Sequence, residues 1–172
     1  ATTVYDTIMD AGQPHGLVNT GYRAIESLRL EKGYRSWGSD IGPDHTPFEA
    51  GLGWAVKLKK SVNFKGREAV ATQAAEGVKK VLAGFTIDDP NVILLGRETI
   101  YRNGERVGWL TSAGFGYTVG KSIGYGYVRS SNAITTSHVE DGDYELDVAS
   151  ERVKCNVHLS PLYDPAMIRI KT

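Results

Sequence analysis

The sequence predicts an α+β fold, in which a helical, loop-rich part over residues 1–77 precedes a small antiparallel β-barrel or sandwich over residues 78–172. Two observations support this division. Before residue 77, apolar residues recur at helical spacing around a Gly- and Pro-rich loop, whereas after it they alternate with polar residues in short runs. The second part contains about six such runs, at spacings typical of a small antiparallel barrel or sandwich.

Two helices are expected near the start of the chain. A short one spans Thr3 to Met9 and is ended by Ala11–Pro14. A second extends from Asn19 to Gly33, with Asn19 or Thr20 as its N-cap and Gly33 as its C-terminal breaker. The apolar face of this second helix is expected to consist of Tyr22, Ile25 and Leu28.

Charged residues of the second helix have the spacing of ion pairs on a solvated helix surface. Glu26 stands one turn before Arg29, and Glu31 one turn before Arg35. Exposed pairs of this kind stabilise a helix by only tenths of a kcal/mol.

A structured loop is predicted for residues 37–53, which contain four Gly and two Pro. Long ordered loops are often functional. Trp54 to Leu58 is then expected to form a short strand, and the Ala-rich segment Gly66 to Glu76 a helix.

The β part contains one strong hairpin signal. Asn103-Gly104 joins Thr99–Arg102 to Glu105–Leu110 and should place Arg102 opposite Glu105. Alternation predicts four further strands: Val81–Ile87, Ile123–Tyr127, Tyr144–Val148 and Val153–Leu159.

Composition excludes several classes of partner. Twenty Lys and Arg balance twenty Asp and Glu, so the chain lacks the basic field on which nucleic-acid binding depends. No apolar run approaches the ~20 residues of a membrane helix, and no signal peptide follows Ala1. We therefore expect a soluble protein with neither a nucleic-acid nor a membrane partner; the lone Cys155 fits a reducing compartment.

Motifs for catalysis or metal binding are absent from the sequence. Gly114–Ser122 ends like a phosphate loop, but Phe115 stands where the Walker pattern needs Gly, and a strand rather than a helix should follow. The four histidines are far apart and lack metal-ligand spacing. Cys155 alternates with apolar neighbours as a core residue does. We predict no catalytic residue and no metal ligand.

Acidic residues in two loops need a separate interpretation. Asp40, Asp44 and His45 share the Pro- and Gly-rich loop and could bind a hard cation or move a proton, but turn and capping roles are favoured. Residues 140–143 lack the alternating carboxylates of a calcium loop and are expected to form a polar turn.

Aromatic residues gather in and beside the long loop: Tyr34, Trp37, Phe48 and Trp54. A planar heteroaromatic ligand could stack on such rings. The alternative, favoured for each ring taken singly, is that the rings bury the loop against the helices. Trp54 is the best candidate for a ligand contact.

Several motifs together resemble a known family. They include Gly21–Ala24 and Ser27–Gly33, Thr46–Trp54, Phe64–Ala69, Gly96–Gly104 and Gly120–Val128. In this order they resemble the folate-binding region of sarcosine and dimethylglycine dehydrogenases, which is similar to the aminomethyltransferase of glycine cleavage. The resemblance covers nearly the whole chain.

The resemblance implies that the reaction is shared between this chain and polypeptide upstream of it. In that family, an N-terminal flavin (FAD) domain oxidises the N-methyl group of a methylated glycine, and tetrahydrofolate in the folate domain captures the one-carbon unit. The resemblance implies that residues 1–77 end the folate-binding domain and that residues 78–172 form a β-barrel. It also implies that the chain is a fragment. Its partner is then the missing upstream part, which holds the catalytic Asp. The expected location is the bacterial cytoplasm or the mitochondrial matrix.

Few of the family's site residues have a counterpart in this chain. Trp54 occupies the position of a family Trp that lies at the folate, and Tyr34 and Arg29 are its candidate companions in cofactor binding. Ile25 and Leu95 stand where glycine-cleavage enzymes have ligand-side arginines. These departures favour the methylglycine dehydrogenase branch over an aminomethyltransferase. They also argue against transfer chemistry, because the loss of two cations weakens pairing with anions or carboxylates.

The leading hypothesis is therefore the C-terminal, catalytically incomplete part of a flavin- and folate-dependent N-methylglycine dehydrogenase. One alternative is an aminomethyltransferase fragment, or an O- or S-demethylase fragment, of the same fold. The other is a non-catalytic barrel used for regulation or protein interaction.

Overall fold

A computed structural model describes residues 1–171 of the chain. Four α-helices, two 3₁₀ turns and six strands follow one another within these residues. The helical elements are α1 (Thr2–Gly12), η1 (Gln13–His15), α2 (Tyr22–Lys32), η2 (Gly53–Ala55), α3 (Arg67–Glu76) and α4 (Thr136–Glu140). The strands are β1 (Lys80–Ile87), β2 (Thr99–Arg102), β3 (Glu105–Gly116), β4 (Lys121–Arg129), β5 (Tyr144–Val148) and β6 (Glu151–His158).

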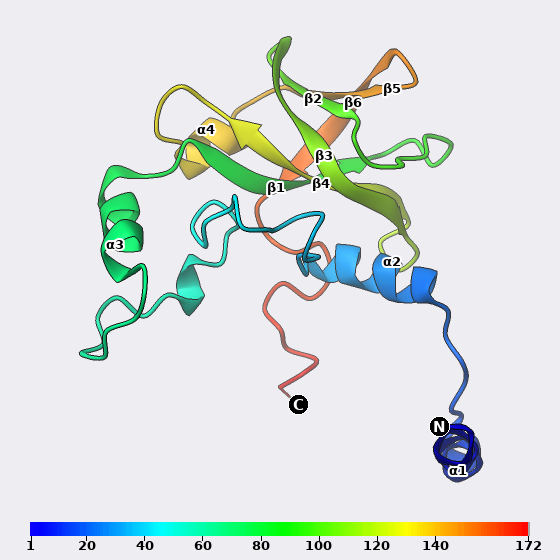
Figure 1. Ribbon diagram of the computed structural model, residues 1–172. Coiled ribbons are helices and arrows are strands. Elements are labelled where there is room, and N and C mark those ends of the chain that lie inside the picture. The colour runs from blue at the N-terminus through cyan, green and yellow to red at the C-terminus, as the bar shows by residue number, and fades with distance from the viewer. Residues whose placement is uncertain (172) are drawn as a thin grey trace.

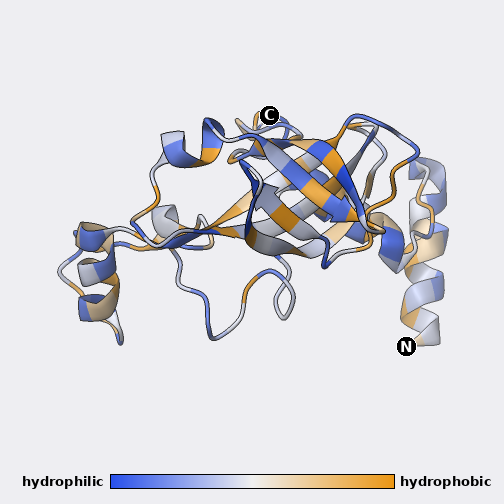
Figure 2. Cartoon of the chain, turned by 90° about the horizontal axis from the view of Figure 1, so that it is seen from above, coloured by the Kyte–Doolittle hydropathy of each residue, from blue (hydrophilic) through white to orange (hydrophobic). Residues whose placement is uncertain are grey.

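The six strands close into an antiparallel barrel in the order β1-β4-β3-β2-β5-β6. This confirms the α+β fold and selects the barrel over the sandwich. The predicted hairpin is present, with Arg102 opposite Glu105 in the register of β2 and β3. Hydrophobic and hydrophilic residues alternate along the barrel strands in Figure 2, because successive side chains point to opposite faces of a sheet.

Two groups of buried apolar residues form the core. Side chains from all six strands fill the barrel, among them Phe85, Ile100, Leu110 and Leu146. The second group, Leu30, Leu82, Ile123, Tyr125 and Tyr127, joins α2 to the outer side of β1 and β4. Strand β4 is therefore buried on both faces.

Glycine is required inside the barrel where β4 passes β3. A Cβ atom at Gly124 would lie 2.4 Å from Leu110 Cδ1, and one at Gly126 would lie 2.5 Å from the Trp109 carbonyl oxygen. Both distances are below van der Waals contact, so a larger residue would displace its neighbours.

The helices are arranged unequally around the barrel (Figure 1). Helix α2 lies beneath the barrel against β3 and β4, whereas α1 and α3 project from the barrel on opposite sides. The C-terminal segment descends past α2. No helix among residues 1–171 is both long enough and apolar enough to cross a membrane.

Several local expectations were wrong. The segment after Trp54 forms the turn η2 and irregular chain instead of a strand, since Gly53 and the backbone bond from Val56 N to Gly53 O close a 3₁₀ turn. Helix α2 begins after Gly21, and neither Asn19 nor Thr20 caps it through a side chain. The C-terminal expectation is confirmed: Gly33 is left-handed, with φ of 69°, a conformation that favours glycine.

Candidate functional site

Helix α2 contacts the barrel through a face that combines the polar Ser27 and Glu31 with the apolar Leu30. Ser27 Oγ donates to the Phe115 carbonyl oxygen of β3 at 2.7 Å, and Leu30 lies one turn further on, against Gly114. The buried residues of α2 are Ser27, Leu30 and Glu31. The polar anchor fixes the orientation of the helix on the barrel.

Glu31 has a structural role that its spacing did not indicate. Its side chain is 2% exposed, and Oε1 accepts hydrogen bonds from the backbone N–H of Thr118 at 2.6 Å and of Val119 at 3.0 Å. The predicted pair with Arg35 was wrong, because Arg35 instead donates to the carbonyl oxygens of Ala50 and Gly33. Glu31 thus holds the β3–β4 turn onto α2.

Arg29 lies at the centre of a buried polar network. Its pair with Glu26 is present at 2.8 Å, but the pair is partly buried rather than solvated. Nη1 of Arg29 also donates to Asp40 Oδ2 at 2.6 Å and to Ser112 Oγ at 3.0 Å. Asp40 further accepts from Thr111 Oγ1 at 2.6 Å. All three guanidinium nitrogens of Arg29 therefore have protein partners.

The apolar face of α2 points away from the barrel. Tyr22, Ile25 and Leu28 are 71%, 56% and 58% exposed. The sequence grouped these three residues on one face correctly, and the structure leaves this face exposed. Because Ser27, Leu30 and Glu31 carry the contacts with the barrel, α2 presents an apolar wall of Tyr22, Ile25 and Leu28 to the outside of this chain.

A cleft of about 430 Å³ lies between α2 and the C-terminal segment. The Lys32 ammonium closes one side through a bond of 2.9 Å to Asp164 Oδ2, and this bond holds the pKa of Asp164 below its ordinary value. The backbone N–H of Tyr163 donates to the Glu31 carbonyl oxygen at 3.0 Å. The walls include Ile25, Leu28, Tyr34, Tyr163 and Ile170.

Trp54 stands on the turn η2 with 75% of its surface exposed. Phe48 packs beneath the turn: a Cβ atom at Gly53 would lie 2.7 Å from its ring, so only glycine permits this approach. The Lys57 ammonium donates to the Trp54 carbonyl oxygen at 2.8 Å. The turn is therefore held from two sides while the indole remains open.

Three of the four loop aromatics do not bury the loop, contrary to the interpretation favoured for each ring. Trp37, Trp54 and Tyr34 are all exposed, and only Phe48 is half-buried. Tyr34 and Arg29 line the cleft beside α2, whereas Trp54 is not among the residues of that cleft. The structure thus brings together two of the three predicted cofactor residues.

Other residues singled out in the sequence have structural partners. Asp40 is 1% exposed and lies within the network around Arg29. The His45 ring stacks on Tyr127, with centroids 4.6 Å apart. Within residues 1–171, no group of three or more His, Cys, Asp and Glu side chains could hold a metal ion. Residues 114–122 form the ends of β3 and β4 and their turn, as the strand interpretation expected.

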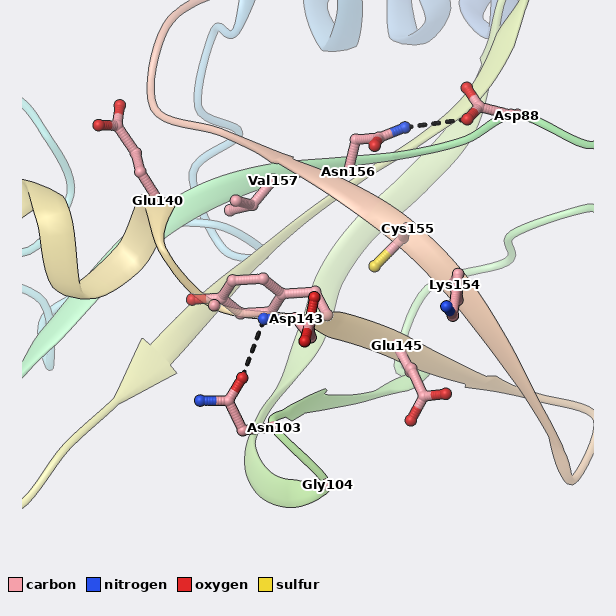
Figure 3. A pocket seen from close by; sticks show the side chains of 12 residues that line it. Asp88, Asn103, Gly104, Glu140, Asp143, Glu145, Lys154, Cys155, Asn156 and Val157 are labelled. Atoms are coloured by element: carbon pink, nitrogen blue, oxygen red, sulfur yellow. Dashed lines mark hydrogen bonds between the residues drawn. The ribbon is translucent and has the colours of Figure 1, made fainter.

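A hollow of about 740 Å³ lies along β5 and β6 (Figure 3). Asp88, Glu140, Asp143 and Glu145 give it an acidic lining. Cys155 also lines it, but burial, with a smaller effect of Glu145, raises the pKa of the thiol to about 12. The thiol is therefore a poor nucleophile.

The sequence did not indicate the partners of buried carboxylates that lie far away along the chain. Asp40 meets Thr111 and Ser112, which lie 71 and 72 positions later. Glu31 meets Thr118 after 87 positions. No spacing rule connects such residues, although an acidic residue next to the apolar Leu30 in a helix is a weak sign of a buried carboxylate.

Comparison with known proteins assigns the class of this fold. The family model of the GCVT N-terminal domain matches residues 1–60, and that of the glycine cleavage T-protein C-terminal barrel domain matches residues 80–164. A crystal structure of the glycine cleavage system aminomethyltransferase T from Bartonella henselae superimposes with a TM-score of 0.81 and 26% identity, covering 96% of this chain and 44% of that one.

Three curated relatives are similar in sequence to this chain. Mitochondrial sarcosine dehydrogenase of Mus musculus is 46% identical over 98% of this chain. Mitochondrial dimethylglycine dehydrogenase of Homo sapiens is 41% identical over 74%. The mitochondrial pyruvate dehydrogenase phosphatase regulatory subunit of Mus musculus is 38% identical over 94%.

These likenesses establish the family. The chain belongs to the glycine cleavage T-protein family and corresponds to the aminomethyltransferase-like region of sarcosine and dimethylglycine dehydrogenases. It spans 18%, 15% and 20% of the lengths of the three relatives.

Proposed function

We propose that this chain is the C-terminal part of a flavin- and folate-dependent N-methylglycine dehydrogenase and that it forms one wall of the tetrahydrofolate site. One observation carries the proposal. Helix α2 buries Ser27, Leu30 and Glu31 and leaves Ile25 and Leu28 exposed, while the indole of Trp54 stands open on an anchored turn. A large open apolar face is a sign of an interaction or ligand site.

The residues present fit a folate. An exposed, held indole offers a flat surface on which a pterin or benzoyl ring can stack. Tyr34 supplies a second exposed ring in the cleft beside α2. Because the guanidinium of Arg29 is already bound to Glu26, Asp40 and Ser112, Arg29 contributes by holding α2 in place rather than by direct contact.

The chemistry of the proposed enzyme is shared between two parts. Flavin, when bound in upstream polypeptide, supplies oxidation of the N-methyl group, and tetrahydrofolate accepts the one-carbon unit. This chain binds and orients the folate and excludes water from one side of it. On this proposal the catalytic Asp lies in the upstream part.

The upstream part is proposed to dock on the apolar wall of α2. Tyr22, Ile25 and Leu28 lie along this wall, and the chain spans less than half of the solved aminomethyltransferase to which it is similar. Both dehydrogenase relatives are mitochondrial proteins by name. This favours the mitochondrial matrix as the location of this protein.

Folate titration tests the proposal. Tryptophan fluorescence is followed in this chain and in the chain joined to the flavin- and folate-binding part of a sarcosine dehydrogenase. We expect tetrahydrofolate to quench the emission, and Trp54→Phe to remove the quenching while Trp109→Phe retains it. Absence of quenching in both proteins would exclude a folate role for this chain.

A regulatory barrel without catalysis is the second candidate. It is favoured by the likeness to a phosphatase regulatory subunit, and by Ile25 and Leu95 at positions where arginines were expected. Folate-dependent oxidation of sarcosine or dimethylglycine by the joined protein would exclude this candidate. Binding of a protein partner without any folate effect on emission would favour it.

A further inference from the structure

We propose that a hollow at the start of β3 binds a phosphate monoester, held by the guanidinium groups of Arg106 and Arg129 beside the ring of Trp109. This site is separate from the proposed folate surface. Arg106 and Trp109 lie near the start of β3, whereas α2 contacts this strand further along, at Phe115. The proposed function and this inference can therefore fail independently.

Arg129 is held in this hollow without a counter-ion. Its guanidinium lies over the Trp109 ring, with the Cζ atom 4.2 Å from the ring centroid. Among residues 1–171, the Arg129 side chain has neither an ion pair nor a hydrogen bond, and its Nη1 atom is buried. A buried N–H without an acceptor costs free energy, so an anionic oxygen at this guanidinium would stabilise it.

The rest of the hollow supplies further donors. Its volume is about 320 Å³, and its lining includes Arg106, Val107, Trp109, Arg129, Ser130 and Ser131. No Asp or Glu is among the residues of the described chain that line it. Arg106 is exposed and has no ion pair within residues 1–171. The Ser130 hydroxyl accepts from the Asn132 N–H at 3.2 Å and retains its own proton to donate.

This set of donors suits a phosphate better than a carboxylate. A phosphate monoester has three terminal oxygens and roughly two negative charges, which can pair with two guanidinium groups at once. A carboxylate has one charge, and a single guanidinium fork satisfies it. Val107 and Trp109, which is 41% exposed, provide an apolar contact for the ester group. Nucleic acid is not favoured, because the chain has no excess of positive charge.

Phenyl phosphate is the probe, and calorimetry is carried out on this chain and on the chain joined to the dehydrogenase part. Arg106→Gln and Arg129→Lys test the two guanidinium groups, since lysine keeps the charge but not the planar fork. Arg23→Gln, at an exposed position of α2, is the matched control. Because Arg106 is exposed, its variant should fold normally, which keeps the test valid if Arg129→Lys disturbs the contact with Trp109.

We expect phenyl phosphate to bind more tightly than benzoate or inorganic phosphate, and high salt to weaken its binding. Arg106→Gln and Arg129→Lys should each weaken the binding of phenyl phosphate about fivefold or more, because each removes a charge-assisted hydrogen bond. Arg23→Gln should change it by less than about twofold, because a distant exposed charge is screened. No binding of phenyl phosphate, equal affinity for benzoate or inorganic phosphate, or unchanged affinity in Arg106→Gln would each overturn the inference.

A second measurement locates the bound probe. Phenylglyoxal modifies free arginine side chains, and peptide mass spectrometry gives the rate at each position. Phenyl phosphate should slow the modification of Arg106 and leave that of Arg23 unchanged, whereas equal protection of both would overturn the inference. Self-association of the chain that is lost in Arg106→Gln and unaffected by phenyl phosphate would also overturn it, and would assign these arginines to a contact between copies.

Discussion

Arg29 Nη1 and Asp40 Oδ2 lie 2.6 Å apart, and this ion pair joins α2 to the long loop at the surface of the barrel. Asp40 Oδ1 also accepts from Ser112 Oγ at 2.7 Å, and the Asp40 carbonyl oxygen accepts from the Tyr127 hydroxyl at 2.9 Å. One loop residue thus contacts α2, β3 and β4. Loss of its charge should loosen the attachment of the helical part to the barrel.

Asp40→Asn should reduce the free energy of unfolding by about 3 kcal/mol, because it leaves Arg29 with a buried, partly unpaired charge. Asp44→Asn is the control, since Asp44 is exposed in the same loop and its change should stay within about 0.5 kcal/mol. Urea unfolding followed by circular dichroism measures both. Equal stability of the two variants would contradict the role given to Asp40.

Opposite faces of α2 should respond differently to substitution. Ile25→Ser on the open face should leave the free energy of unfolding of this chain within about 0.5 kcal/mol, whereas Leu30→Ala, at a residue 1% exposed, should lower it by about 3 kcal/mol. Co-purification with the upstream dehydrogenase part should then weaken for Ile25→Ser. A strong loss of stability in Ile25→Ser would show that this face is already packed.

Cys155 should resist alkylation in the folded chain. Burial raises the pKa of its thiol to about 12, and the thiolate is the reactive form. With iodoacetamide at about pH 8, the folded chain should react at least about a hundredfold more slowly than the chain in urea. Mass spectrometry over time measures both rates, and similar rates would show that the thiol is accessible.

Stability should fall on mild acidification because of His158. Burial, with a smaller contribution from the charge of Lys121, lowers the pKa of His158 below its ordinary value of 6.5, and its Nε2 lies 2.8 Å from Thr86 Oγ1. The unfolded chain therefore binds this proton first as the pH falls. The contribution of neutral His158 is complete above about pH 6.5 and is lost progressively below it.

Urea midpoints at about pH 7.5 and about pH 5.5 measure this effect. The difference between the two midpoints should shrink in His158→Gln and persist in His15→Gln, because His15 is exposed. Asp88 and Asp164 have lowered pKa values, so they lose their contributions only at lower pH, below this window. An unchanged difference in His158→Gln would contradict the assignment.

Local sequence signals predicted the elements that depend on neighbours in the chain. Asn103-Gly104 specified the hairpin because its backbone conformation suits a tight turn, and alternation specified the barrel strands. Gly33 ended α2 as expected. The strand predicted after Trp54 was wrong, because a short apolar run does not by itself specify a strand, and the segment begins with the turn η2.

The sequence by itself determined the order of helices and strands and the grouping of Tyr22, Ile25 and Leu28 on one side of α2. Only the tertiary structure decided which side of α2 meets the barrel. The reason is physical: Ser27, Arg29 and Glu31 find buried partners on β3 and its turn more than eighty residues later, and hydrogen bonds over such separations leave no periodic trace in the chain.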